Sequence, residues 1–245
     1  MKADPAAQKR LLDLAAVDAE LTRLAHRRRT LPEHAELDAA ETAVRTSKDA
    51  LVEAETAAGD LDRDIRRIER DVEGVVARTE KDRALLAGSG IGAKQATELQ
   101  HELDTLARRQ AVLEDEQLEI MEQREALGGN LDHARRLLGE AEEKLSDVTV
   151  RRDTELADVA AAEAGRGRDR EAILPALPAD LLGAYEARRS QGKTGAGLLR
   201  ERRCGACRLE LDRTYLARLK GTAPDEVVEC EECGAILVRT AESGL

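Results

Sequence analysis

Apolar residues recur along most of the chain with alternating three- and four-residue spacing, separated by charged and polar residues. Two limbs carry the pattern, and its positions are Leu61, Ile65, Ile68, Val72, Val75, Thr79 and Leu86 in the first, and Leu99, Leu103, Leu106, Gln110, Leu113, Gln117, Ile120, Arg124, Leu127, Leu131, Ala134, Leu138, Ala141, Leu145 and Val148 in the second. A register kept over this many heptads predicts a coiled-coil seam rather than the wider apolar stripe of a globular helix. The polar members Gln110, Gln117 and Arg124 are either tolerated beside a solvated seam or fix the register of one helix on the other.

A glycine-rich segment separates the two limbs. Residues 87–93 read Ala-Gly-Ser-Gly-Ile-Gly-Ala, and a short loop between two helices makes them antiparallel neighbours. We therefore expect a hairpin with its tip near 87–93, whose arms of about 70 to 80 residues each extend on the order of 110–120 Å at the helical rise. Asp4 before Pro5 predicts a helix start. Pro32 lacks an amide donor and predicts a kink or break in the first arm.

The composition changes in the last third of the chain, and we place a domain boundary near residue 168. Residues 1–168 are predicted to form the coiled-coil hairpin, and residues 169–245 a linker helix followed by a small module that contains all the cysteines. Two prolines precede the linker helix, which is expected from about residue 179 to 190.

The composition agrees with a narrow seam rather than a broad core. Of the 245 residues, 36% are charged and 1% are aromatic, the aromatic ones being Tyr185 and Tyr215. Aromatic side chains bury the largest area per residue, so a thick interior is not expected. The sequence holds no run of about 18 apolar residues and no apolar leader, from which we expect a cytoplasmic protein without membrane contact.

The four cysteines occur as two Cys-x-x-Cys pairs, Cys204 with Cys207 and Cys230 with Cys233, separated by 22 residues. Two such turns can direct four thiolates at one tetrahedral ion, which is the arrangement of a structural zinc site. Disulfides fit poorly without an export signal, and a thioredoxin-like dithiol lacks its βαβ context. Iron in a four-thiolate shell has the same spacing. We predict one structural Zn²⁺ with no open coordination position for catalysis.

Short apolar runs flank both cysteine pairs, with Leu198-Leu199 before the first and Val227-Val228 and Ile236-Leu237-Val238 around the second. Two knuckles on β-hairpins, with a short helix at 212–220 between them, define a zinc ribbon. The predicted fold class is therefore mainly α, a long antiparallel coiled-coil helical hairpin plus a small C-terminal β zinc ribbon. About 50 residues bury too little area to fold alone, so metal binding must complete the stability of this module.

Other motifs give weaker signals. Residues 187–194, Ala-Arg-Arg-Ser-Gln-Gly-Lys-Thr, fit a relaxed phosphate-loop pattern. No buried strand precedes them, so we interpret the match as accidental.

No catalytic set can be named from the sequence. The four histidines lie far along the chain from the cysteines, and carboxylates are spread along both arms. We therefore expect no enzyme activity. His101, near the tip, is kept as a candidate contact residue.

Positive charge is concentrated around the cysteines. Residues 188–220 hold ten basic and three acidic residues, a net charge of +7, whereas the whole chain carries −11 and the remainder therefore −18. A basic ribbon beside acidic helices indicates attraction to nucleic acid or to an acidic protein. The arginines could instead balance the charge of a tetrathiolate site, pair with acids of the hairpin or solvate the module. The candidate contact residues are Arg200, Arg202, Arg203, Arg208, Arg213 and Lys220. With few aromatic residues for base stacking, nucleic-acid binding would rest on phosphate contacts.

The combination resembles the bacterial C4-type zinc-ribbon family of long coiled-coil hairpins followed by a C-terminal ribbon, and within it an actinobacterial member. The resemblance spans essentially the whole chain and is carried by residues 98–122 after the tip and by the motifs Cys204-Gly-Ala-Cys207 and Cys230-Glu-Glu-Cys233-Gly. It implies zinc on the four cysteines and an adaptor or chaperone-like role. Related members are associated with flagellar gene expression, with binding of a transcription factor or messenger RNA, and with type III secretion. The tip differs from the proline-containing tip of relatives, so the architecture transfers and the process does not.

Two functions are compatible with these features. The first is a non-enzymatic zinc-binding adaptor or chaperone-like protein, whose coiled coil binds a protein partner and whose basic ribbon binds nucleic acid or an acidic protein surface. The alternative is a nucleic-acid-binding regulator that acts on RNA or DNA through the ribbon, with the coiled coil setting only spacing or dimerisation. A monomer or a weak dimer is expected in either case.

Overall fold

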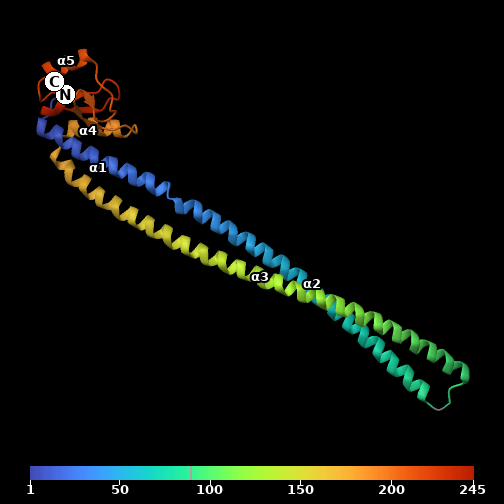
Figure 1. Cartoon of the computed structure of the whole chain (residues 1–245). Coiled ribbons are helices and arrows are strands. Elements are labelled where there is room, and N and C mark those ends of the chain that lie inside the picture. Colours follow the sequence, from blue (N-terminus) through green and yellow to red (C-terminus); the bar gives the residue numbers. More distant parts are fainter. Residues whose placement is uncertain (89) are drawn as a thin grey trace. The chain divides into compact units, whose positions relative to one another are not determined.

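The computed structural model describes residues 1–88 and 90–245, which form two compact units. We call Met1–His34 with Arg151–Leu245 the base unit, and Ala35–Val150 the hairpin unit. Long helices form the predicted hairpin, and the small strand region is C-terminal (Figure 1). Ser89, in the middle of the predicted tip, lies outside the described residues.

Three long helices account for most of the chain: α1 (Pro5–Arg29), α2 (Pro32–Ala87) and α3 (Ala93–Ile173). The predicted N-cap is confirmed, because the Asp4 carboxylate accepts a hydrogen bond from the Ala6 amide at 2.7 Å. The predicted break at Pro32 is also confirmed, since α1 ends at Arg29 and α2 begins at Pro32 itself. A proline at the first helical position loses nothing, because that amide has no partner within the helix.

The predicted end of the second arm near residue 168 is wrong, because α3 continues to Ile173. The helix passes through Gly165 and Gly167, each of which costs about 1 kcal/mol relative to alanine in a helix interior. Two contacts offset this cost. Arg166 pairs with Asp169 at 3.1 Å along the helix, and Arg170 pairs with Asp18 of α1 at 2.9 Å. Packing against α1 therefore carries the helix through its glycines.

The predicted seam is confirmed in the hairpin unit, where each of its positions is buried or half-buried. Arg124 settles one of the open alternatives, because its Nε donates to the Asp62 carboxylate of α2 at 2.8 Å and so links the two helices in one register. Gln110 instead donates to Glu114 of its own helix at 2.7 Å, as expected of a polar residue that is merely tolerated. No helix among the described residues is both long and apolar enough to cross a lipid bilayer.

The rest of the base unit consists of short elements around one small sheet. They are η1 (Leu174–Ala176), α4 (Ala179–Arg189), β1 (Ala196–Arg200), β2 (Arg203–Cys204), α5 (Arg213–Gly221), β3 (Val228–Glu229), β4 (Ile236–Val238) and η2 (Ala241–Ser243). The strand order is β2-β1-β4-β3, with antiparallel β1–β2 and β3–β4 pairs. The two predicted β-hairpins are thus present, and parallel pairing of β1 with β4 joins them side by side.

Each face of this sheet covers a different apolar cluster. The base core lies on one face and contains Leu11 and Leu14 of α1, Leu177, Leu181 and Tyr185 of the α4 region, and Ala196 and Ile236 of the sheet. The ribbon core lies on the other face and contains Leu199, Cys204, Leu211, Tyr215, Leu219, Cys230 and Leu237. Successive residues of a strand point to opposite faces, so β1 and β4 supply both clusters. The ribbon is therefore built onto α1 and α4.

The N-terminal residues also join the ribbon. The Ala3 amide donates to the Asp225 carbonyl at 2.7 Å, and the Val227 amide donates to the Met1 carbonyl at 3.0 Å. These bonds flank an isolated antiparallel bridge between Lys2 and Glu226, just before β3 in the chain. Nothing in the sequence pattern indicated this pairing, which joins segments more than 200 residues apart.

Candidate metal centre and its basic face

The two Cys-x-x-Cys turns have the same backbone geometry. In the first, the Arg208 amide donates to the Cys204 carbonyl at 2.7 Å and the Cys204 amide donates to the Leu209 carbonyl at 3.0 Å. In the second, the Gly234 amide donates to the Cys230 carbonyl and the Cys230 amide to the Ala235 carbonyl, both at 2.8 Å. Each turn therefore holds its two sulfurs on one side, as a zinc knuckle requires.

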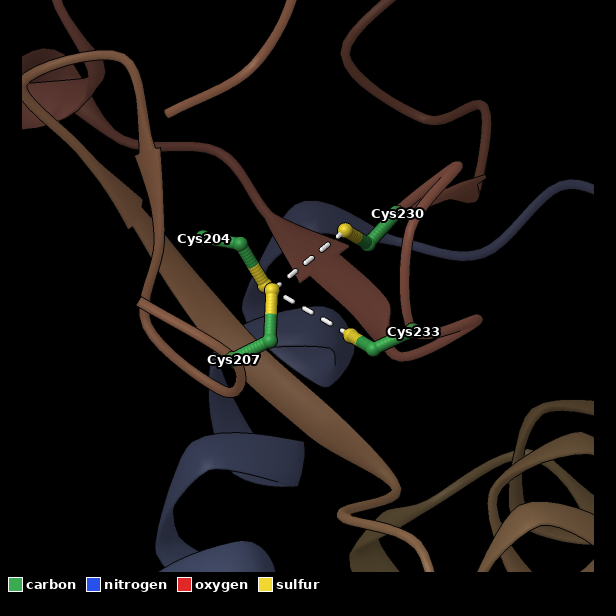
Figure 2. Close-up of side chains that lie close together, drawn as sticks. All are labelled: Cys204, Cys207, Cys230 and Cys233. Atoms are coloured by element: carbon green, nitrogen blue, oxygen red, sulfur yellow. Dashed lines mark hydrogen bonds between the residues drawn. The ribbon is translucent and has the colours of Figure 1, made fainter. Parts of the chain in front are cut away.

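The four sulfurs converge from the two knuckles (Figure 2) and all lie within 4.8 Å of one another. Cys204 Sγ lies 3.9 Å from Cys233 Sγ, and Cys207 Sγ lies 3.9 Å from Cys230 Sγ. A tetrahedron with Zn–S bonds of about 2.3 Å has edges of about 3.8 Å. The donor set and its spacing thus fit one zinc ion, and four thiolates complete its shell. The predicted ligands Cys204, Cys207, Cys230 and Cys233 form one structural zinc site.

Burial and hydrogen bonds shift the pKa values of the cysteine thiols unequally. Burial raises the pKa of the Cys204 thiol to about 12, although the amides of Cys207 and Ala206 act against it. Burial also raises the pKa of Cys233. Burial alone would raise the pKa of Cys207, but hydrogen bonds from the Leu209 amide and the three neighbouring thiols together outweigh it, so the pKa of Cys207 is lowered. Zinc therefore displaces protons when it binds, and its affinity rises with pH.

Two glycines allow the first knuckle to lie directly on strand β1. A Cβ at Gly197 would lie 2.5 Å from the Ala206 nitrogen, and a Cβ at Gly205 would lie 2.6 Å from the Leu198 oxygen. Both distances are too short for a side chain. No sequence motif indicates these glycines, because their role depends on a contact between two segments rather than on a local turn.

All six candidate contact residues are exposed, four of them within four residues of Cys204 and the other two, Arg213 and Lys220, on α5. Arg202, Arg208, Arg213 and Lys220 make no ion pair with any residue in the described ranges. Arg200 and Arg203 make only long pairs, at 3.5 Å to Glu242 and 3.9 Å to Glu210, with more than 60% of each side chain exposed. Such pairs add little stability. Most of the predicted basic face is therefore available to an external anion.

Two further arginines of the basic segment point inward. Arg188 of α4 donates to the Gly234 carbonyl in the second knuckle and pairs with Glu229. Arg189 pairs with Asp18 at 3.2 Å. The suggestion that some arginines pair with acids of the hairpin therefore holds for Arg189, whereas Arg188 pairs with an acid of the ribbon.

A buried polar cluster around Asp18 was missed by the sequence analysis. The Asp18 carboxylate, 6% exposed, accepts a hydrogen bond from the Tyr185 hydroxyl at 2.8 Å and pairs with Arg170 and Arg189. Burial, the hydrogen bond to Asp18 and its charge raise the pKa of Tyr185 well above the usual range. No sequence signal could have found this cluster, because its members lie on three separate helices.

The apparent phosphate loop caps the end of a helix. The amides of Ser190, Gln191 and Gly192 donate to the carbonyls of Glu186, Arg188 and Arg189, at 2.9 to 3.1 Å. They point back into α4 and cannot surround a phosphate, which requires free amides at a helix N-terminus. His101 lies exposed on α3 in the hairpin unit, remote in sequence from the cysteines.

These features define a coiled-coil hairpin protein with a C4 zinc ribbon. Residues 14–193 match the family described as CT398-like coiled coil hairpin domain, and residues 203–237 match the C4-type zinc ribbon domain. The chain belongs to this CT398-like family, as the sequence resemblance predicted.

Mycobacterial proteins are among its relatives. The chain is 42% identical to the Mycobacterium tuberculosis protein Rv2229c over 239 residues, which are 98% of each chain. A solved structure from Mycobacterium smegmatis has a TM-score of 0.89 at 41% identity, and the match covers 98% of this chain and 100% of that one. CT398 from Chlamydia trachomatis has the same fold at 16% identity, with a TM-score of 0.68 and coverage of 96% and 98%.

Proposed function

We propose that the protein is a non-enzymatic, cytoplasmic adaptor that binds RNA or DNA through the basic face of its zinc ribbon and a protein partner through its coiled-coil hairpin. One observation carries the first half of the proposal. Arg202, Arg208 and Arg213 are exposed and make no ion pair within the described part of the chain, although the chain as a whole is strongly acidic. Arg200 and Arg203 make only the two long, exposed pairs. Most acidic residues of the chain lie outside this face, and its exposed arginines are not neutralised by them. This charge distribution favours an anionic ligand at the basic face.

Phosphate contacts would supply most of the affinity. Tyr215, the one aromatic residue of the ribbon core, is buried and has Arg218 stacked over its ring at 5.0 Å. Its ring is therefore not available for base stacking. The ribbon is thus better suited to contact the phosphate backbone of a nucleic acid than to recognise its bases.

The coiled-coil hairpin supports the second half of the proposal. Large apolar side chains are exposed on its outer surface, with Leu118 at 59% and Met121 at 47%. Apolar residues outside the seam add nothing to the pairing of α2 with α3, and they suit contact with another protein.

The salt dependence of nucleic-acid binding tests the ribbon. A duplex that contacts about five cations should give a slope of log K against log salt near −4 to −5. The triple variant Arg202→Ala, Arg203→Ala and Arg208→Ala should make this slope less negative by about 2 to 3. Fluorescence anisotropy with labelled RNA and DNA measures both values. Binding of a polyglutamate peptide in place of nucleic acid would favour an acidic protein as the ligand, and no binding of either at low salt would exclude this role for the ribbon.

A second experiment separates the adaptor from a nucleic-acid-binding regulator whose hairpin only sets spacing. Affinity capture with the full chain and with Leu118→Ser/Met121→Ser should be done after nuclease treatment. Protein partners that survive nuclease and disappear with the variant support the adaptor. Partners that all depend on nucleic acid favour the regulator.

A further inference from the structure

The four zinc ligands differ in their access to solvent. Cys204 and Cys230 are 0% and 2% exposed, whereas Cys207 and Cys233 are half-buried. The two outer cysteines line a surface pocket of about 320 Å³, together with Lys193, Thr194 and Glu232. A small molecule in solution therefore meets the metal centre at Cys207 and Cys233.

Each outer sulfur also has an inner sulfur of the other knuckle beside it. Cys207 Sγ lies 3.9 Å from Cys230 Sγ, and Cys233 Sγ lies 3.9 Å from Cys204 Sγ, as the dashed lines of Figure 2 indicate. A disulfide has an S–S length of about 2.05 Å. Closing either gap needs a shift of about 2 Å between the knuckles, which are turns at the ends of short strands.

We propose that Cys207 and Cys233 are the sites at which hydroperoxides oxidise this metal centre, with cross-knuckle disulfides Cys207–Cys230 and Cys204–Cys233 as the products. The inference concerns the zinc site alone and does not depend on whether the ribbon binds nucleic acid.

The chemistry proceeds in two displacements. The outer thiolate attacks one oxygen of hydrogen peroxide, the O–O bond breaks, and a sulfenic acid and hydroxide result. The inner thiolate then attacks the sulfenyl sulfur and expels a second hydroxide. Two thiolates have lost two electrons to form one S–S bond, and the peroxide has been reduced to two hydroxides, which take up two protons and become water. The two thiolates that remain cannot hold the ion.

The pocket also supplies a charge that assists the first displacement. Lys193 is one of the residues that line the pocket, and its positive charge favours the departing hydroxide. Glu232 on the same wall opposes it. A single charge at partly screened distance changes such a rate by about three-fold.

The experiment treats the zinc-loaded full chain with hydrogen peroxide. Dimedone traps sulfenic acids, peptide mass spectrometry identifies the labelled and the disulfide-linked cysteines, and a chromophoric chelator records zinc release. The expected result is dimedone on Cys207 and Cys233, followed by the two cross-knuckle disulfides and loss of zinc, all reversed by a dithiol reductant with added zinc.

Two variants test access through the pocket while leaving all four ligands in place. Lys193→Gln should slow zinc release by about three-fold, and Glu232→Gln should accelerate it by a similar factor. Lys220→Gln on α5, outside this pocket, is the matched control and should leave the rate unchanged. Equal labelling of Cys204 and Cys230, disulfides within a knuckle as first products, or unchanged rates in both pocket variants would each overturn the inference.

Discussion

In the base unit, apolar side chains from helices and strands converge on two cores, whereas in the hairpin unit each helix offers its neighbour a single row. Leu11 and Tyr185 of the base core and Leu199 and Leu237 of the ribbon core are each 0% or 1% exposed. In the hairpin unit, no apolar residue between Ile68 and Leu113 is fully buried within the described ranges, and the buried residues there are Thr79 and Asp82.

The polar residues of that stretch differ from similar residues elsewhere. Threonines of the long helices commonly donate to the carbonyl four residues earlier, as Thr22, Thr42, Thr46, Thr56, Thr97, Thr105 and Thr149 do. Thr79 is 6% exposed, and its hydroxyl has no hydrogen-bond partner among the residues that the structure describes. Asp82 is 1% exposed and is paired at 2.8 Å with Arg78 of its own helix.

One chain poor in aromatic residues thus stabilises two kinds of structure. Where several elements meet, burial is deep and a metal adds to it. Where two helices meet alone, burial is shallow, and one or two polar residues lower the local stability. Within the hairpin unit, the stretch between Ile68 and Leu113 is therefore expected to open with the smallest free energy.

Removal of zinc should have the largest effect, because metal binding supplies on the order of 10–16 kcal/mol in small zinc modules. Excess chelator should unfold the ribbon core around Tyr215 while the base core and the long helices persist. Far-UV circular dichroism should keep most of its helical signal, and the NMR signals of Tyr215 should collapse while those of Tyr185 remain. Loss of all helical signal with the metal would show that the two cores are one folding unit.

Replacement of the buried carboxylate in the base unit comes next. Asp18→Ala leaves Arg170, Arg189 and the Tyr185 hydroxyl without their anion, and should destabilise the base unit by about 3–5 kcal/mol. The control is Asp13→Ala, whose exposed pair with Arg10 at 3.2 Å is expected to contribute about 0–1 kcal/mol. Urea unfolding followed by tyrosine fluorescence measures both. Equal losses in the two variants would contradict a central role for Asp18.

In the hairpin unit, an apolar seam should be more stable than the natural one. Thr79→Val/Asp82→Leu removes a hydroxyl without a partner and a buried carboxylate, and should stabilise this stretch by about 1–2 kcal/mol. Hydrogen exchange of amides in residues 69–112 should slow accordingly. Thr56→Val, at an exposed threonine that bonds to its own helix, is the control and should give no protection.

The smallest effect concerns the backbone of the first knuckle. Arg208 has φ +65°, and the equivalent residue of the second knuckle is Gly234, with φ +76°. Arg208→Gly should stabilise the ribbon by about 1 kcal/mol by removing a left-handed residue with a side chain. If the arginine contacts phosphate, the variant should also lower the salt slope by about 1. Thermal unfolding and anisotropy separate the two effects, and lower stability would show that the Arg208 side chain supports the fold.

Local and periodic features were predictable from the sequence. The seam from Leu61 to Val148 was predictable because the spacing of apolar residues along a helix determines which of them share a face. The helix break at Pro32, the cap at Asp4 and the four zinc ligands were also predictable, since each depends on a few neighbouring residues or on a short motif.

Features that join distant segments could not be predicted in this way. Asp18 meets Arg170 and Tyr185 across more than 150 residues, and the N-terminal residues pair with those before β3. The continuation of α3 past residue 168 has the same origin, because a contact with α1 overrides the local preference of two glycines.

The amino-acid sequence by itself determined the helical hairpin, its seam and the chemistry of the metal site. The tertiary structure decided that one face of the ribbon's sheet packs against α1 and α4, that a buried carboxylate of α1 meets α4 there, and which two sulfurs face solvent. The physical reason is that periodicity and ligand spacing are properties of one segment, whereas burial and charge pairing depend on which segments meet.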